Sequence, residues 1–111
     1  MSVYSIWESA FPADRRQEGT EVTQRIWADM RAFDGYVAHE IVEDLDRPGH
    51  LFVVSRWENR EAADAAMSYR SSPTAQRADA LASGPRRRTV GRLIGSASAR
   101  APAMPTPAMP R

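Results

Sequence analysis

The stretch that decides the fold covers residues 35–67, GYVAHEIVEDLDRPGHLFVVSRWENREAADAAM. Two apolar-leaning runs, residues 36–45 and 51–57, flank the turn-rich sequence DRPG at residues 46–49, a pattern typical of a β-hairpin. The second run leads directly into ENREAA at residues 58–63, which favours the start of a helix. The stretch therefore predicts two antiparallel strands followed by a helix.

The second strand of this hairpin is apolar at four consecutive positions, LFVV at residues 51–54. Because side chains alternate between the two faces of a strand, both faces of the sheet need cover. One short helix covers only one of them. The other face must meet either more of this chain or another subunit.

The residues before the hairpin predict a strand and an amphipathic helix. Residues 3–11 mix β-branched and aromatic residues with small polar ones, as strands do, and Pro12 ends the run. Residues 14–33 place apolar side chains at helical spacing, so they form one buried stripe. Trp27 falls at the edge of this stripe, where it is available for a contact outside the domain. Gly35 is expected to end the helix in the left-handed conformation.

The residues after the hairpin predict two helices and a last strand. Residues 59–70 are expected to form the second helix, and SSP at residues 71–73 interrupts it. Ser72 is placed to cap a short third helix over residues 74–83. Residues 86–97 alternate between two sets of side chains, which predicts a strand with a basic start.

The C-terminal residues differ in composition from the rest of the chain. Residues 97–111 are rich in Ala and Pro, with four prolines among fifteen residues. Such a segment lacks the apolar bulk needed to offset the entropy lost on ordering. We therefore expect one domain over residues 1–96 and a disordered tail over residues 97–111.

The order strand, helix, strand, strand, helix, strand is the βαββαβ pattern of the ferredoxin-like fold. It predicts an α+β domain with one four-stranded antiparallel sheet and helices on one face. The open face is apolar, and the chain has no spare helix to cover it. An identical subunit is the simplest cover, so the sequence predicts a homodimeric α/β barrel with a cavity between the paired sheets.

Composition excludes several classes of function. Fifteen arginines, with no lysine, balance fourteen acidic residues to a formal charge of +1, so nucleic acid is not an expected partner. The lack of cysteine excludes disulfides, a thiol nucleophile and thiolate metal sites. The N-terminal sequence MSVYSIWE does not have the pattern of a signal peptide, and no run is long enough to span a membrane. The expected location is cytoplasmic, with no membrane partner.

Three segments resemble the antibiotic biosynthesis monooxygenase family. They are FDGY at residues 33–36, the hairpin turn at residues 44–49, and VVSRWENREA at residues 53–62, in which Trp57 and the following Glu are the most specific part. The resemblance covers approximately residues 3–96 and implies a dimeric α+β barrel. Members of the family oxidise aromatic polyketides with O2 and without metal or flavin, degrade haem, or oxidise quinols, and relatives on the same barrel catalyse cyclisations.

The resemblance implies a cofactor-independent monooxygenase that acts on an aromatic polyketide-like intermediate of bacterial secondary metabolism, with O2 as co-substrate. Haem degraders of the family carry a histidine ligand after the second helix begins, and residues 67–77 contain none, so haem degradation is not expected. His39 and His50, without cysteine, make a poor metal site, and no metal is expected. Two alternatives stay open: a polyketide cyclase or related ring-forming enzyme, and a non-catalytic accessory protein that binds a small ligand.

His39 and Arg92 are the candidate catalytic residues. His39 is the only mid-strand group that titrates near neutrality, so it is the first candidate for the base, provided that it faces the interior. The alternative is a histidine with a structural role at a sheet edge or dimer interface. Arg92 is a candidate to stabilise a developing phenolate or enolate, unless it is paired or extends to solvent. His50, beside the turn, is expected to be solvated.

Aromatic side chains supply the expected binding surface for a flat substrate. Tyr4 and Trp7 lie on opposite faces of the first strand, so one of them faces the open side, and Trp7 is the candidate for the pocket. Trp57 is expected to anchor the core, and Asn59 to cap the second helix. The candidate substrate-binding residues are Trp7, Tyr36, Phe52, Arg56, Trp57 and Tyr69. The run Arg86, Arg87 and Arg88 is expected to be a solvated start of the last strand.

Overall fold

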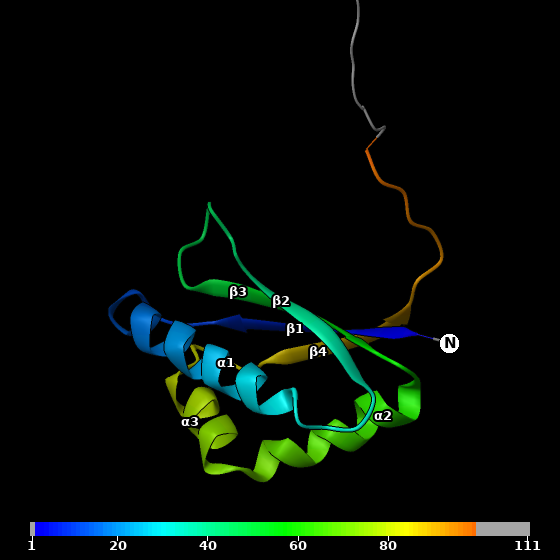
Figure 1. Cartoon of the computed structure of the whole chain (residues 1–111). Coiled ribbons are helices and arrows are strands. Elements are labelled where there is room, and N and C mark those ends of the chain that lie inside the picture. Colours follow the sequence, from blue (N-terminus) through cyan, green and yellow to red (C-terminus); the bar gives the residue numbers. More distant parts are fainter. Residues whose placement is uncertain (1, 100–111) are drawn as a thin grey trace, which may run out of the picture.

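The computed structural model describes residues 2–99 and confirms the ferredoxin-like α+β fold (Figure 1). Four strands, β1 (Val3–Ala10), β2 (Tyr36–Glu43), β3 (His50–Trp57) and β4 (Arg87–Arg92), form one sheet in the order β2-β3-β1-β4. Each pair of neighbouring strands is antiparallel. The sheet therefore brings the first and last strands together with the hairpin, as the βαββαβ pattern predicts.

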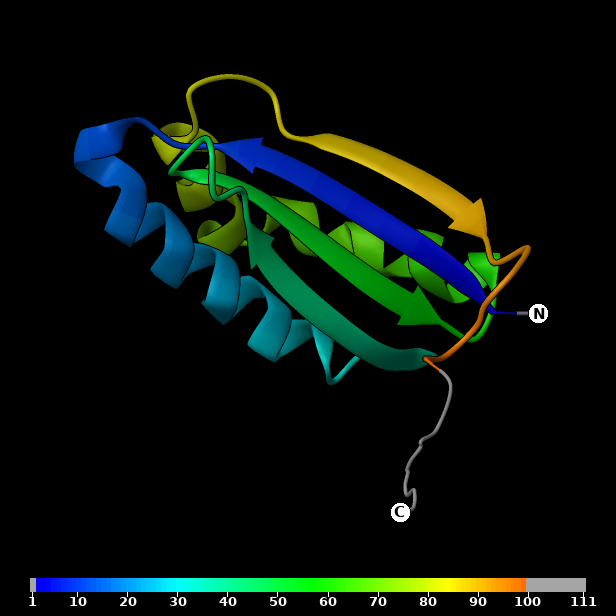
Figure 2. The same ribbon diagram turned by 90° about the horizontal axis from the view of Figure 1, so that it is seen from above.

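The helices all lie on one face of this sheet (Figure 1). A short 3-10 turn, η1 (Ala13–Arg15), leads into α1 (Arg16–Met30). After β3 come α2 (Arg60–Ala65), the 3-10 segment η2 (Ala66–Ser71) and α3 (Pro73–Leu81). Figure 2 looks onto the opposite face of the sheet, which no helix of residues 2–99 covers. None of these helices is long and apolar enough to cross a membrane.

Local signals set the ends of the elements as predicted. Gly35 has a φ of 82°, in the left-handed region that glycine tolerates. The Asn59 side chain accepts a hydrogen bond of 2.8 Å from the backbone N–H of Ala62 and caps α2. Ser72 accepts one of 3.1 Å from Ala75 and caps α3. The predicted second helix is shorter than expected, because its C-terminal half continues as the 3-10 segment η2.

The last strand is also shorter than predicted. β4 ends at Arg92, and residues 93–99 are exposed and have no regular secondary structure. The predicted tail, residues 97–111, lies outside the described residues from residue 100 onward. The division into a domain of residues 1–96 and a tail therefore stays a prediction.

The core lies between the sheet and the helices. Its most buried large side chains include Trp57, 1% exposed, and Leu51, 2% exposed. The sequence predicts Trp27 at the edge of the buried stripe, available for a contact outside the domain. This expectation is wrong, because Trp27 is only 3% exposed and belongs to this core. α1 packs against α3 as well as against the sheet, so the buried arc of α1 is wider than one apolar stripe.

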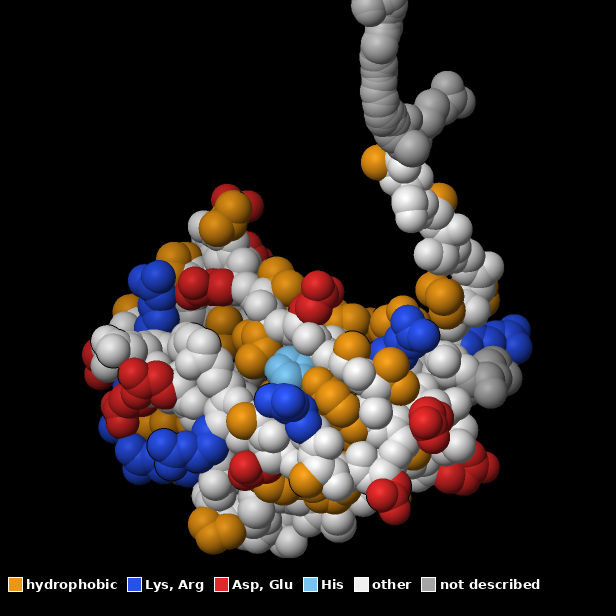
Figure 3. All heavy atoms as spheres, in the orientation of Figure 1, with side chains coloured by type: hydrophobic (Ala, Val, Ile, Leu, Met, Phe, Trp, Pro, Cys, Tyr) orange, Lys and Arg blue, Asp and Glu red, His pale blue; other side chains and the backbone are white. Residues whose placement is uncertain are grey.

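The open face carries the side chains of alternate strand residues. Tyr4, Ile6 and Glu8 face this side on β1, and their partners on β3 are Arg56, Val54 and Phe52. Figure 3 shows that this face is hollowed between the hairpin tip and residues 93–99, which both rise above the sheet. The sheet therefore presents a concave, partly apolar surface.

Candidate active site

Two small adjoining voids lie between the sheet and the helices, and all three tryptophans line them. We call these voids together the tryptophan pocket. Trp7 and Trp27 line both voids, and Trp57 lines the inner one. The residues shared by both voids are Trp7, Trp27, Met30, Ala66 and Met67. The outer void adds Ile26, Tyr69, Arg70, Ala75 and Arg86, and the inner void adds Ser5, Trp57, Ala63 and Arg88.

The tryptophan pocket is nearly closed. The space open to the centre of a water molecule is about 20 Å³ in the outer void and about 10 Å³ in the inner void. By the same measure one water needs roughly 10–15 Å³. The pocket therefore has room for one or two waters, and a larger ligand has to displace part of its wall.

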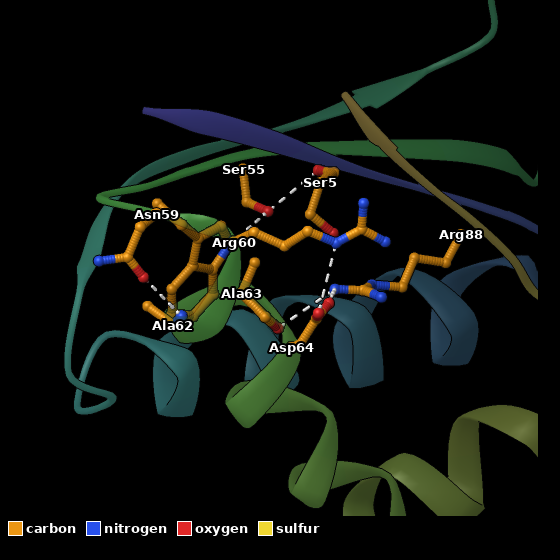
Figure 4. A network of polar contacts seen from close by, with 9 residues as sticks. Ser5, Ser55, Asn59, Arg60, Ala62, Ala63, Asp64 and Arg88 are labelled. Carbon is orange, nitrogen blue, oxygen red and sulfur yellow. Dashed lines mark hydrogen bonds and ion pairs between the residues drawn. The ribbon is translucent and has the colours of Figure 1, made fainter. Parts of the chain in front are cut away.

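Hydrogen bonds fix the inner wall of the pocket (Figure 4). The Trp57 indole N–H donates to Ser55 Oγ at 3.0 Å, and this hydroxyl donates to the Ser5 carbonyl oxygen at 3.0 Å. Ser55 is fully buried. The indole of Trp57 is therefore held in one orientation by a polar group that strand β3 itself supplies.

Arginine side chains line the β4 side of the pocket. The guanidinium carbons of Arg70 and Arg86 lie 5.4 Å and 5.2 Å from the centre of the Trp7 ring. Arg86 is paired with Asp79 at 2.7 Å, and its side chain is 9% exposed. The expected solvated run is therefore wrong for Arg86. Arg86 lies in the turn just before β4, and its side chain extends back over the Trp7 ring instead of into solvent.

Arg88 is likewise not a solvated side chain. In the register of the sheet it lies opposite Trp7, on the face that the helices cover. One of its terminal nitrogens donates to the Ala63 carbonyl at 3.2 Å and to the Asp64 carboxylate at 3.1 Å (Figure 4). Its side chain is 18% exposed. Only the middle arginine of the run, Arg87, fits the sequence expectation.

Tyr69 connects the outer void to the surface. Its hydroxyl donates to the Asp29 carboxylate at 2.5 Å, and the exposed Asp29 lies on α1. Partial burial and the hydrogen bond to Asp29 raise the pKa of Tyr69 above its usual value. Tyr69 is therefore a neutral phenol that contacts the pocket on one side and a solvated carboxylate on the other.

His39 lies beside the tryptophan pocket and does not line it. Its ring centre is 5.5 Å from that of Trp27, and Nδ1 is 2.6 Å from the Tyr36 hydroxyl. Burial, and then the charge of Arg31, lower the pKa of His39 below 6.5. A neutral ring that carries its proton on Nε2 accepts a hydrogen bond from the Tyr36 hydroxyl at Nδ1. His39 instead lines a surface groove between α1 and β2, which Arg31 and Glu40 also line.

The structure separates the predicted site residues into three groups. Trp7, Trp57 and Tyr69 meet in the tryptophan pocket. Tyr36 and His39 form a layer next to it, with the Tyr36 ring 5.7 Å from that of Trp57. The remaining three, Phe52, Arg56 and Arg92, lie elsewhere.

Phe52 and Arg56 project from the open face of β3, while the buried residues of that strand face the helices. Arg92 is exposed at the end of β4, opposite Val3. The expected orientation of Trp7 is wrong, because Trp7 faces the helices and Tyr4 faces the open side. The tryptophan pocket thus lies between the sheet and the helices of this chain and not on the open sheet face.

His50 differs from its predicted solvated state. Its Nε2 lies 2.8 Å from a carboxylate oxygen of Glu8, and its side chain is 15% exposed. The ring also packs 5.0 Å from that of Phe52. β3 begins at His50, so this residue belongs to the open face of the sheet and not to the turn. Within residues 2–99, no three His, Asp or Glu side chains are grouped as in a metal site.

The family model described as antibiotic biosynthesis monooxygenase matches residues 2–80. This match covers most of the chain, and the protein therefore belongs to this family. Membership supports a general monooxygenase function. No curated protein matches the chain significantly.

Solved structures share the fold. SnoaB, a cofactor-independent oxygenase from Streptomyces nogalater, has a TM-score of 0.75 and 17% identity, over 86% of this chain and 95% of its own. Rv0793 from Mycobacterium tuberculosis has a TM-score of 0.70 and 25% identity, over 88% of this chain and 100% of its own. A conserved protein from Methanosarcina mazei Go1 has a TM-score of 0.70 and 10% identity, over 83% of this chain and 92% of its own.

Proposed function

We propose that the protein is a cofactor-independent monooxygenase that oxidises an aromatic, polyketide-like substrate with O2 in bacterial secondary metabolism. The observation that carries this proposal is the tryptophan pocket, a mostly apolar space walled by three indoles, with Tyr69 among the residues that line its outer void. Indole rings offer flat surfaces on which a polycyclic ring system stacks. The family and the similarity to SnoaB, a cofactor-independent oxygenase, support the reaction class.

The proposed reaction needs only a substrate that gives up a proton and an electron readily. Loss of a proton from an activated CH2 group of an anthrone-type ring yields a carbanion. The carbanion transfers one electron to O2, and the resulting radical and superoxide combine to a peroxide anion, which takes back a proton to give a hydroperoxide. Loss of water then leaves a ketone, so one oxygen atom enters the product and the other leaves as water. Apolar walls keep the charged and radical intermediates away from solvent.

Tyr69 and Asp29 are our first candidates for moving the substrate proton. Within the outer void, Tyr69 supplies the only hydroxyl among the lining residues. As the Tyr69 oxygen accepts the substrate proton, its own proton passes to Asp29 along the 2.5 Å hydrogen bond. Asp29 is exposed and exchanges this proton with water. The pair thus forms a path from the closed pocket to solvent.

The sequence-based candidates for the chemistry remain second proposals. His39 is neutral and close to Trp27, so as a base it needs a water or a shift of Trp27 to reach the substrate. Arg92 can stabilise negative charge only on a substrate that extends beyond the pocket, because Arg92 lies exposed at the end of β4. The arginines that do line the pocket stabilise a negatively charged substrate from a shorter distance.

Entry of the substrate requires part of the wall to open, and η2 is the segment suited to this. It supplies Met67, Tyr69 and Arg70 to the outer void. η2 is a six-residue 3-10 segment, and 3-10 runs longer than three or four residues are uncommon and often mark hinges. We propose that η2 moves away from Trp7 to admit the substrate.

We also propose a homodimer formed through the open sheet face. Ile6 and Val42 are 36% and 49% exposed there, and Phe52 and Val54 are only partly covered. Large exposed apolar patches usually mark an interaction surface. A second copy of the same face buries this one in a dimer with two-fold symmetry. Analytical ultracentrifugation should show a dimer, and Val54→Asp should convert it to monomer. A wild-type monomer at micromolar concentration would contradict the dimer.

Oxygen uptake tests the reaction class. With an anthrone-type substrate and a metal chelator present, we expect uptake that follows product formation, and no product under anaerobic conditions. Tyr69→Phe should lower the rate at least about 10-fold, the usual scale for general acid–base catalysis being roughly 100-fold or more. Tyr4→Phe, on the opposite face of the sheet, is the matched control and should retain the rate.

Other outcomes of this assay favour other functions. Conversion that continues without O2 would indicate a cyclase or related ring-forming enzyme. Tight binding without turnover would indicate an accessory protein that binds a small ligand. A His39→Ala variant with a full rate would remove His39 as the base, and a Tyr69→Phe variant with a full rate would remove the proton path through Asp29.

A further inference from the structure

The charged residues that line the tryptophan pocket are all arginines. Arg70 and Arg86 line the outer void and Arg88 lines the inner void, and neither void has an acidic lining residue. A cation in an apolar space is unfavourable unless it has a partner. The partners of these three side chains therefore decide what kind of ligand the pocket accepts.

The nearby carboxylates do not balance these cations. Asp79 pairs with Arg86, while Asp64 is shared between Arg88 at 3.1 Å and Arg60 at 3.4 Å (Figure 4). Arg70 forms no ion pair within residues 2–99. Three guanidinium groups thus share two carboxylates on this side of the pocket, and Arg70 adds a fourth cation. Asp29, on the α1 side, is engaged by Tyr69.

One arginine nitrogen lacks an acceptor. Nε of Arg88 is buried and is the only buried side-chain nitrogen or oxygen of residues 2–99 without a hydrogen-bond partner. The terminal nitrogen of the same guanidinium is anchored to Ala63 and Asp64, which restricts the group. Leaving a buried donor unpaired is unfavourable, and a charged donor more so. The inner void beside Arg88 is where an acceptor would sit.

The stacking surface adjoins these donors. Arg88 lies opposite Trp7 in the β1–β4 register, and the guanidiniums of Arg86 and Arg70 lie within 5.4 Å of the Trp7 ring centre. A planar oxyanion matches the fork of a guanidinium better than a neutral group does. An aromatic ring stacked at Trp7 can therefore direct an acidic substituent to Arg88.

We propose that the β4 side of the tryptophan pocket is a carboxylate-binding subsite, so that the substrate is an aromatic compound with an acidic substituent. Arg88 Nε–H binds the carboxylate, Arg86 contributes a second guanidinium, and Arg70 closes over the bound ring with η2. The proposal rests on the proposed function for the use of this pocket, but its test needs only binding.

Isothermal titration of the full chain with 2-naphthoate and with the neutral 2-naphthamide tests the subsite. We expect the carboxylate to bind at least about 10-fold more tightly than the amide, as a charge-assisted hydrogen bond implies. Arg88→Gln and Arg86→Gln should each remove most of this preference and change the amide affinity less than two-fold. Arg87→Gln, the matched loss of one charge on the opposite face of β4, should leave the preference intact.

Arg88→Gln also loses the bond to Asp64, so its fold is checked by circular dichroism. If it does not fold, Arg70→Gln replaces it, because the Arg70 side chain is exposed and forms no ion pair within residues 2–99. A preference that survives both Arg86→Gln and the second variant would overturn the subsite.

The remaining outcomes separate the subsite from the oxygenase. Equal affinity for carboxylate and amide would overturn the subsite while oxygen uptake still supports the proposed function. A carboxylate preference in a protein that consumes no O2 would support the subsite and overturn the oxygenase. If neither compound binds, both the subsite and the use of this pocket are wrong.

Discussion

Replacing Ser55 by alanine removes the polar centre of the inner wall. The Ser55 hydroxyl accepts a hydrogen bond from the Trp57 indole and donates one to the Ser5 carbonyl, each at 3.0 Å. Ser55 is 0% exposed and Trp57 1% exposed, so water does not replace the lost acceptor. The substitution therefore leaves a buried indole N–H without a partner.

The expected loss of stability follows from these contacts. An unpaired buried donor costs roughly 1–3 kcal/mol, and the small volume removed adds little. We expect Ser55→Ala to lower the free energy of unfolding by about 2 kcal/mol. For a domain of this size that corresponds to a decrease in melting temperature of about 10 °C.

A double-mutant cycle isolates the Ser55–Trp57 bond. Trp57→Phe removes the donor, so Ser55→Ala in that background loses only the bond to Ser5 and should cost about 1 kcal/mol, the usual net value of one hydrogen bond. Urea unfolding followed by far-UV circular dichroism, at one protein concentration, gives the four free energies. The exposed Ser71→Ala is the control and should cost less than about 0.5 kcal/mol. A loss below about 0.5 kcal/mol for Ser55→Ala, or no coupling to Trp57, would refute the reasoning.

Three further predictions concern a glycine and two titrating groups. Gly35→Ala should lower the free energy of unfolding by roughly 2–4 kcal/mol, because φ is 82° and the new Cβ would overlap the Cβ of Ala62 on α2. Gly84→Ala meets nothing within 4 Å and should be nearly neutral in urea unfolding. NMR should show that His39 titrates below 6.5, because burial and then Arg31 lower its pKa. The unfolded chain then binds this proton first, so stability falls as pH drops through 6.5, and a midpoint at or above 6.5 would contradict this. The pKa of Glu43 is held below 4.5, mainly by a backbone N–H, so its contribution is present above pH 4.5 and lost as pH falls through the folded pKa. Glu43→Gln should flatten the acid dependence of stability, and an unchanged slope between about pH 3 and 6 would count against it.

Local signals in the sequence were sufficient to predict the order of the elements. The hairpin turn, the caps at Asn59 and Ser72, and Gly35 act within a few residues, and the structure confirms each of them. The burial of Trp27 was missed because it depends on α3 packing beside α1, which no spacing within α1 reveals.

Which face of each strand meets the helices could not be predicted. On β1 both alternating sets contain apolar side chains, with Trp7 in one set and Ile6 in the other, so the pattern did not decide between them. The arginines of the pocket were missed for the same reason. Arg88 shares a face with Val90 by alternation, but only the pairing of β4 with β1 places that face under the helices.

The central claim is that the ligand binds between the sheet and the helices of a single chain. The most direct measurement is a 15N-HSQC titration of the assigned protein with 2-naphthoate, which reports every backbone amide at once. We predict the largest shifts at Ala66, Met67, Tyr69 and Arg88, which line the tryptophan pocket. Shifts confined to Tyr4, Phe52 and Arg56 would place the ligand on the open sheet face and contradict the account.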